Sequence, residues 1–168
     1  MIKKLTLMST LTAVALIIFI VEAQIPLPIP VPGVKLGLAN AVTLFALFYE
    51  KKSGVLKLGT VNVFAILLCR ILLGAVFSGR LIAFVYSLLG GLLAFAAQIT
   101  VKRFITKKQI WVCGAIGAIF HNIGQIAAAT VITGTTSIVY YLPVLIIAGV
   151  FTGVLTGLVA QITIERIK

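Results

Sequence analysis

Three side chains that can bind a ligand lie within five residues of one another in an otherwise apolar stretch, His121-Asn122-Ile123-Gly124-Gln125. Residues three or four apart share one face of a helix, so an imidazole and two carboxamides would point to the same side. These groups donate and accept hydrogen bonds, which predicts binding of a polar small molecule; hydrogen bonding between helices is the alternative. One His without a Cys or Asp cluster is a poor ligand set, so no metal site is predicted.

Acidic side chains are scarce, because the chain contains no Asp and only Glu22, Glu50 and Glu165. Reactions that use paired carboxylates, or Mg²⁺ held by carboxylates, lack their usual groups here. No P-loop sequence is present either. The sequence therefore predicts a protein that is not an enzyme, with no catalytic residue and no cofactor.

The elements that must position these groups are apolar and long. Of the 168 residues, 61% are hydrophobic and 10% are charged, which predicts an all-α integral membrane protein. We expect one domain, residues 1–168, of six transmembrane helices. Their expected ranges are about 5–24, 36–49, 55–77, 81–101, 110–133 and 140–164. The second range is short against the roughly 20 residues that cross a bilayer.

A proline-rich segment separates the first two predicted spans. Pro26, Pro28, Pro30 and Pro32 alternate with apolar residues, a pattern that forbids a helix and favours an extended chain. Extended backbone at membrane depth needs protein or a watery cavity around it. The segment is therefore predicted to be either a lid over a pocket or a stiff connector.

Basic residues give the predicted topology. Eleven of the 14 Lys and Arg residues fall on one side when the apolar ranges are taken as spans. Cytoplasmic loops carry such an excess, so we expect both termini to be cytoplasmic and the protein to lie in the plasma membrane. The net charge of +11 flanks the spans, where it would meet anionic lipid, and does not predict nucleic-acid binding.

Polar residues from separate spans share the external half in this topology. We predict a pocket open to the external face, with Tyr140 and Tyr141 at the same depth and Arg80 adding to a surplus of positive charge that favours an anionic ligand. Glu22 is expected to form an ion pair with Arg70 or to relay a proton. The predicted substrate-binding residues are Lys35, Asn40, Arg70, His121, Asn122 and Gln125.

Small residues recur at helix-packing spacing. Gly149, Gly153 and Gly157 form a row in the last span that predicts close helix packing. Ser9 and Ala13 form a similar pair in the first span and are the candidates for contact with a partner helix.

Three motifs carry a resemblance to a known family. They are Pro32-Gly-Val-Lys-Leu-Gly-Leu-Ala-Asn40 followed by Val42-Thr-Leu, then His121-Asn-Ile-Gly-Gln125, then Tyr140-Tyr-Leu-Pro-Val-Leu. The chain resembles, over nearly its whole length, the family labelled heptaprenyl diphosphate synthase component I, also called the Gx transporter family. That family is similar to the substrate-binding S components of energy-coupling-factor (ECF) transporters.

The resemblance implies a function. S components are six-helix proteins that bind a vitamin-like molecule in their external half, under a first loop that acts as a gate. They work with a transmembrane T component and two cytoplasmic ATPases. Their first helix commonly carries an AxxxA contact motif, from which Ser9-x-x-x-Ala13 departs.

Two other functions stay open at this point. The first is a non-catalytic membrane subunit of a prenyl diphosphate synthase, held through the basic residues 102–108. Catalysis by this chain alone is excluded, because such synthases use aspartate-rich Mg²⁺ sites. The second is a self-contained secondary transporter, for which Glu22 is the only candidate proton carrier.

Overall fold

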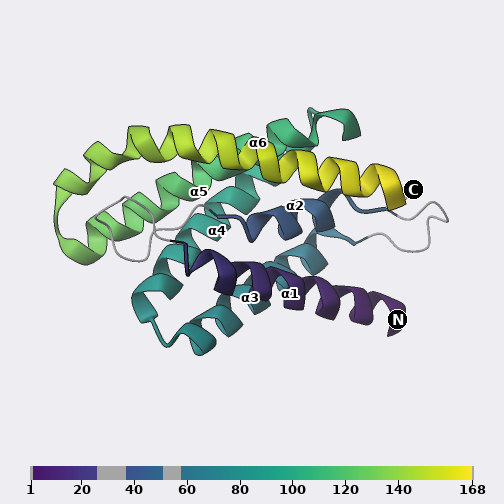
Figure 1. The fold of residues 1–168 in the computed structure, drawn as a ribbon, viewed down its shortest axis with the longest axis horizontal. Helices are drawn as coiled ribbons and strands as arrows, with labels where there is room; N and C mark the ends of the chain where they lie inside the picture. The colour runs from purple at the N-terminus through teal and green to yellow at the C-terminus, as the bar shows by residue number, and fades with distance from the viewer. Residues whose placement is uncertain (1, 26–36, 51–57, 168) are drawn as a thin grey trace.

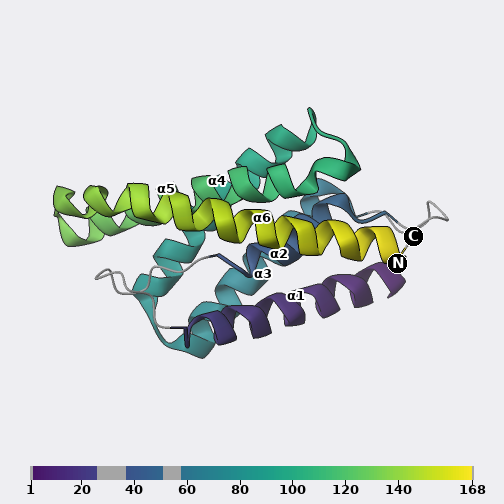
Figure 2. The same ribbon diagram turned by 45° about the horizontal axis from the view of Figure 1, so that its top comes forward.

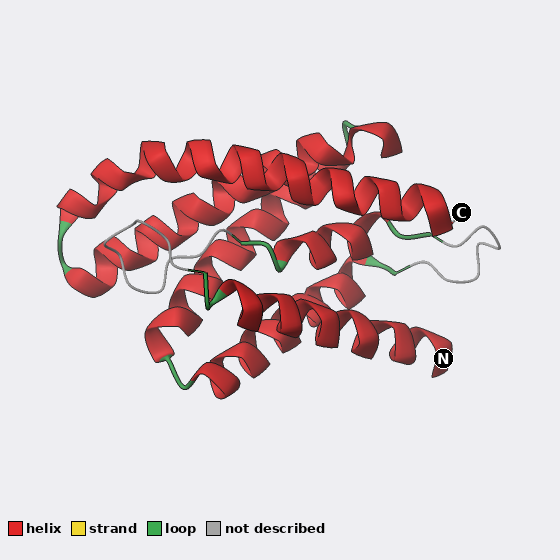
Figure 3. Ribbon diagram, viewed as in Figure 1, coloured by secondary structure: helices red, strands yellow, loops and turns green. Residues whose placement is uncertain are grey.

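The computed structural model describes residues 2–25, 37–50 and 58–167, and in these residues it contains helices and no strands (Figures 1 and 3). Two short 3₁₀ helices, η1 (Lys107–Gln109) and η2 (Thr136–Tyr141), precede the last two α-helices. The α-helices are α1 (Ile2–Glu22), α2 (Asn40–Phe48), α3 (Thr60–Ser78), α4 (Leu81–Lys102), α5 (Ile110–Thr133) and α6 (Leu142–Ile167). The prediction of an all-α protein is confirmed.

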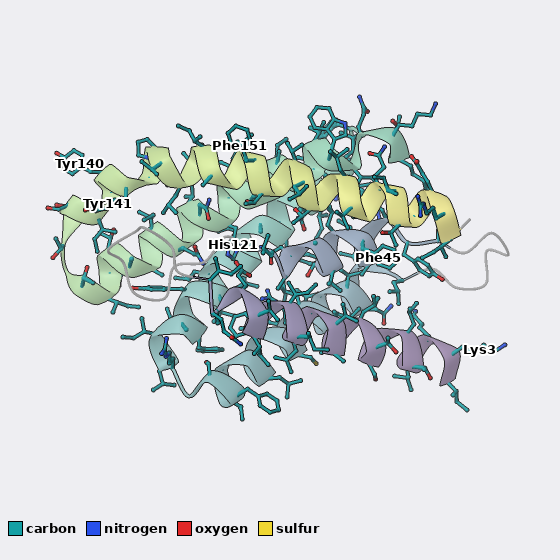
Figure 4. All side chains as sticks on the ribbon, in the orientation of Figure 1. Lys3, Phe45, His121, Tyr140, Tyr141 and Phe151 are labelled. Atoms are coloured by element: carbon teal, nitrogen blue, oxygen red, sulfur yellow. The ribbon has the colours of Figure 1, made fainter. Side chains whose placement is uncertain are left out.

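Five helices of the described part are long and apolar enough to cross a membrane: α1, α3, α4, α5 and α6. At about 1.5 Å per residue, the 24 residues of α5 extend about 36 Å. Large apolar side chains cover the outside of the bundle; Val61 is 80% exposed and Phe151 is 73% exposed. Figure 4 shows Phe151 pointing away from the bundle on α6. A surface of this kind fits lipid, so the chain is an integral membrane protein.

Helix α2 differs from the predicted second span. It has nine residues, about 14 Å, and cannot cross a bilayer by itself. Gly37 has a positive φ of 81°, so the chain turns there and the helix begins only at Asn40. The backbone is extended again at Tyr49. The sixth complete span therefore stays a prediction, and the helix observed in its place is short and largely buried.

The helices enclose α2. Figures 1 and 2 show α1 and α3 on one side of it and α5 and α6 on the other, and α2 contacts all five other helices. Seven of its nine residues are buried. A polar residue on α2 is therefore placed inside the bundle, away from lipid.

Both termini lie at the same end of the elongated molecule (Figures 1 and 2). Lys107 of η1 and Glu50, which follows α2, form an ion pair of 3.1 Å. The α5–α6 connection forms the opposite end, where Tyr140 is 85% exposed (Figures 1 and 4). A common end for the two termini agrees with termini on one side of a membrane.

Glycines bring α5 and α6 together. Gly149, Gly153 and Gly157 are buried on α6. A Cβ atom on Gly153 would lie 2.6 Å from the carbonyl oxygen of Gly114, and one on Gly157 would lie 2.5 Å from Cα of Trp111. The backbones of the two helices are thus in direct contact, and this row packs within the bundle.

Candidate functional site: a buried polar cluster around the start of helix α2

Four ionisable or amide side chains from four helices are buried inside the bundle. Glu22 ends α1, Asn40 begins α2, Arg70 lies on α3 and His121 lies on α5. Their exposed fractions are 4%, 9%, 3% and 3%. Burying such groups among apolar helices is costly, which makes them the candidate functional site.

Gly37 ties the cluster together. Its N–H donates to Oε1 of Glu22 at 2.5 Å, which joins the end of α1 to the start of α2. A Cβ atom on Gly37 would lie 2.9 Å from Cδ2 of His121 and 3.1 Å from Nδ2 of Asn40. Only glycine fits this position, because of both the close approach and the positive φ. No role was predicted for Gly37 from the sequence. Its position just before a short apolar run was the feature that could have indicated one.

Arg70 interacts with three neighbouring side chains, two of which belong to the cluster. Its Nη2 donates to Oδ1 of Asn40 at 3.3 Å, and its Cζ lies 5.9 Å from the centroid of the Phe19 ring. It also interacts electrostatically with Glu22. The described cluster thus holds one guanidinium and one carboxylate.

The predicted surplus of positive charge is not assembled by the described residues. Arg80 is exposed at the start of α4, outside the cluster. Lys35 lies outside the described residues. A preference for a fully anionic ligand would therefore depend on Lys35.

Three polar groups near the start of α2 are buried and have no hydrogen-bond partner among the described residues. They are Nδ2 of Asn40, Nε of Arg70 and the hydroxyl of Thr43. Buried polar groups are normally paired, so these groups favour a ligand rich in acceptor oxygens, such as a carboxylate, phosphate or carbonyl group. Thr43 was not among the predicted residues. Its spacing of three residues from Asn40 places both on one face of a helix, and this spacing could have indicated it.

His121 is enclosed by glycines. A Cβ atom on Gly90 of α4 would lie 2.8 Å from Nδ1 of His121, and Gly37 lies on another side of the ring. Figure 4 shows His121 in the middle of the molecule. The ring can therefore contact a ligand only through the cluster, and not from the lipid side.

The other predicted residues lie in different surroundings. Nδ2 of Asn122 donates to the carbonyl oxygen of Leu145 at 2.5 Å, so Asn122 faces α6 and joins two helices. Gln125 is buried at 1% exposure, one turn beyond His121. Tyr140 and Tyr141 lie at the end of the molecule, far from His121, so their predicted place in the pocket is wrong (Figure 4).

A small cavity next to Asn40 has a volume of about 10 Å³. This volume accommodates about one water molecule. Pockets for small molecules are typically about 300 Å³ or larger. This cavity alone is therefore too small to hold such a molecule.

A groove of about 400 Å³ lies on the outside of the bundle between α1 and α3. Ser9, Ala13 and Cys69 line it, and all three are exposed. Of the two cysteines, Cys113 is buried and Cys69 is exposed. Among the described residues, no group of three His, Cys, Asp or Glu side chains could hold a metal ion.

Comparison with known proteins gives one match. A family model described as heptaprenyl diphosphate synthase component I matches residues 11–163. Neither a curated protein nor a solved structure shows significant similarity to the chain. The matched range includes every member of the buried cluster. The chain belongs to the heptaprenyl diphosphate synthase component I family, as its motifs suggested.

Proposed function

We propose that this protein is the substrate-binding S component of an ECF-type uptake transporter. It captures a small polar or anionic molecule from the external face of the plasma membrane, and its termini are cytoplasmic. One observation carries the proposal: buried groups of Asn40, Arg70 and Thr43 lack partners among the described residues in the interior of a membrane bundle. The role is binding and not catalysis.

The chemistry of these groups supports a ligand with acceptor oxygens. Arg70 already uses Nη2 on Asn40, and its Nε remains for a second contact. Glu22 balances the charge of Arg70, so the cluster can take a neutral carbonyl as well as a carboxylate or phosphate. Lys35, outside the described residues, would add a further positive charge in this proposal.

Capture requires the start of α2 to open. The contact between Gly37 and Glu22 and the contact between Asn40 and Arg70 hold it in place. Both contacts involve groups that a ligand would address. A ligand can therefore replace these two contacts with hydrogen bonds of its own, so that the charges of Glu22 and Arg70 stay hydrogen-bonded.

Energy for uptake has to come from partners in this proposal. The partners are a transmembrane T component and two cytoplasmic ATPases, together with the surrounding lipid. The groove with Ser9 and Ala13 offers small exposed residues for a partner helix.

The second candidate is a non-catalytic membrane subunit of a prenyl diphosphate synthase, which the family description favours. Such a subunit would hold the soluble enzyme through the basic end of the bundle. Lys107 and Lys108 are exposed there. In this case the buried cluster would serve stability alone.

Isolation of the tagged protein from native membranes in mild detergent distinguishes the two candidates. Partners are identified by mass spectrometry. Recovery of a multi-span protein with two ATPases is expected. Recovery of a soluble prenyl synthase without ATPases would overturn the uptake proposal in favour of the second candidate.

A further inference from the structure

The small cavity next to Asn40 is lined by neutral polar side chains from two helices besides α2. Gln98 belongs to α4, and Thr152 and Thr156 belong to α6. The full lining comprises Gly37, Asn40, Leu44, Gln98, Gly114, Ala118, Thr152, Gly153 and Thr156. An empty cavity in a membrane bundle would be expected to have an apolar lining, so this one calls for an occupant.

Gln98 is the longest polar side chain in the lining. It is 2% exposed, and its backbone carbonyl oxygen accepts from the thiol of Cys113 at 3.5 Å. The side chain lies over Gly117, where a Cβ atom would be 2.5 Å from Nε2 of Gln98. Glycine at this position leaves the space that the carboxamide fills. The fold thus places a buried amide, with two hydrogen-bond donors and an acceptor oxygen, at the cavity.

The two threonines supply acceptors. The Thr152 hydroxyl donates to the carbonyl oxygen of Gly149 at 3.2 Å, and the Thr156 hydroxyl donates to that of Gly153 at 3.1 Å. Each hydroxyl proton is therefore engaged, and the oxygen lone pairs are left to accept. Together with Nδ2 of Asn40 and the Gln98 carboxamide, the cavity offers both donors and acceptors.

Charge and size restrict the occupant. No charged side chain of the described residues lines the cavity, and the nearby Arg70 already occupies Oδ1 of Asn40. A cation would meet the field of Arg70, and an anion would meet the acceptor oxygens of the threonines. The volume of about 10 Å³ admits a group the size of one water molecule.

We infer that this cavity is a binding site for one neutral hydrogen-bonding group, which is a water molecule in the ligand-free protein. The carboxamide of Gln98 binds this water, and the water links α4 to α6 next to the candidate site. Because Asn40 lines this cavity as well, the polar end of a captured molecule would replace the water, and only this last step rests on the proposed function.

Radiolytic hydroxyl labelling of the purified protein tests for the water. Radicals formed from an internal water oxidise the side chains next to it. Leu44 lines the cavity and is 1% exposed, whereas Leu67 is fully buried in the apolar core and serves as the matched control. We expect several-fold more labelling at Leu44 than at Leu67. Equal labelling of the two leucines would overturn the inference.

Thermal unfolding of Gln98→Met, Thr156→Val and the double variant tests the anchor. A shared water makes the two residues interdependent, so each single variant should lower Tm by about 2–4 °C and the double variant by less than the sum. Thr163→Val is the control, because its exposed hydroxyl only donates to the carbonyl oxygen of Val159. A higher Tm for Gln98→Met would show that no water is bound to the carboxamide of Gln98. Effects of the two substitutions on Tm that simply add in the double variant would show the same, and either result would overturn the inference. Neither test needs the transported molecule or a partner, so a failure here is separate from a failure of the uptake proposal.

Discussion

Arg70 supplies a buried positive charge to the cluster, and its neighbours define what its removal should do. Its substitution by Ala or Gln leaves the Glu22 carboxylate inside the bundle without the charge of Arg70. Breaking a buried ion pair typically costs about 3–5 kcal/mol. We expect Arg70→Gln to be strongly destabilising and Glu22→Gln/Arg70→Gln to be milder than the sum of the single variants.

Thermal unfolding in detergent measures this coupling between Arg70 and Glu22. Native mass spectrometry of the same preparations measures the small molecule that is retained. If Arg70→Ala loses the molecule no more than it loses folded protein, Arg70 serves as a structural partner of Glu22 and not as a ligand contact.

Thr43 separates binding from stability more cleanly. Its buried hydroxyl has no hydrogen-bond partner among the described residues, so Thr43→Val removes a polar group of nearly the same size without breaking a protein contact. We expect an unchanged or slightly higher Tm in the ligand-free protein and about tenfold weaker retention of the captured molecule, since one hydrogen bond contributes about 1 kcal/mol or more.

Thr130→Val is the control for Thr43→Val, because Thr130 donates to its own helix at the carbonyl oxygen of Ile126. Retention of the captured molecule by Thr43→Val at the level of the unaltered protein would remove Thr43 from the site.

Gly37 and Gly79 form a matched pair for the geometry of the site. Both have positive φ, of 81° and 61°, so alanine is strained at each. A Cβ atom on Gly79 would meet nothing within 4 Å, whereas a Cβ atom on Gly37 would meet His121 and Asn40. We expect Gly79→Ala to cost about 1–2 kcal/mol and Gly37→Ala clearly more. Urea or thermal unfolding measures both, and equal costs would contradict the close packing at Gly37.

Some members of the site could be predicted from the sequence because membrane topology fixes depth. Asn40, Arg70 and His121 were expected in the same layer, and the structure brings them together. Depth does not fix the rotation of a helix, so the direction of Asn122 toward α6 could not be predicted. Depth also gave the wrong position for Tyr140, because α6 and η2 extend beyond the layer of the cluster.

At the scale of elements, the short helix α2 is held at its C-terminal end by Lys102 of α4. The Lys102 ammonium donates to the carbonyl oxygen of Leu47 at 2.5 Å and lies 5.3 Å from the centroid of the Phe48 ring. A cation at a helix C-terminus satisfies carbonyl groups that have no partner in the helix.

We expect Lys102→Met to lower the free energy of unfolding by about 1–3 kcal/mol, because a charged hydrogen bond at a buried helix end is lost. Lys107→Met removes only an exposed ion pair with Glu50, which is worth at most about 1 kcal/mol. Unfolding of the two variants, measured side by side, checks the difference. Equal effects would mean that Lys102 does not hold α2.

The start and length of α2 could not be predicted from hydropathy. Residues 36–49 are mostly apolar, with Asn40 and Thr43 as the polar exceptions, and such a run alone does not show where a helix begins. The turn at Gly37 decides it, and that turn depends on Glu22, which lies 15 residues earlier in the sequence. In contrast, the range predicted for the fifth span, 110–133, coincides with α5, because Gly134 ends the helix in a left-handed conformation.

At the scale of the whole molecule, the uptake proposal requires the α5–α6 connection to face outward. In a Cys69→Ala background, an impermeant maleimide applied to intact cells should label Ser137→Cys and should not label Lys108→Cys until the cells are opened. Both positions are exposed, at opposite ends of the described bundle. The reverse pattern of labelling would place the termini outside and contradict capture from the external face.

The shortness of α2 also bears on biogenesis. Insertion machinery responds to apolar segments of about 20 residues, and a nine-residue helix does not provide one. Among the described residues, the carbonyl group of Leu47 accepts from Lys102, which the ribosome adds 55 residues later. The candidate site also takes His121 from α5, so during translation it can be complete only after both α4 and α5 have joined the bundle.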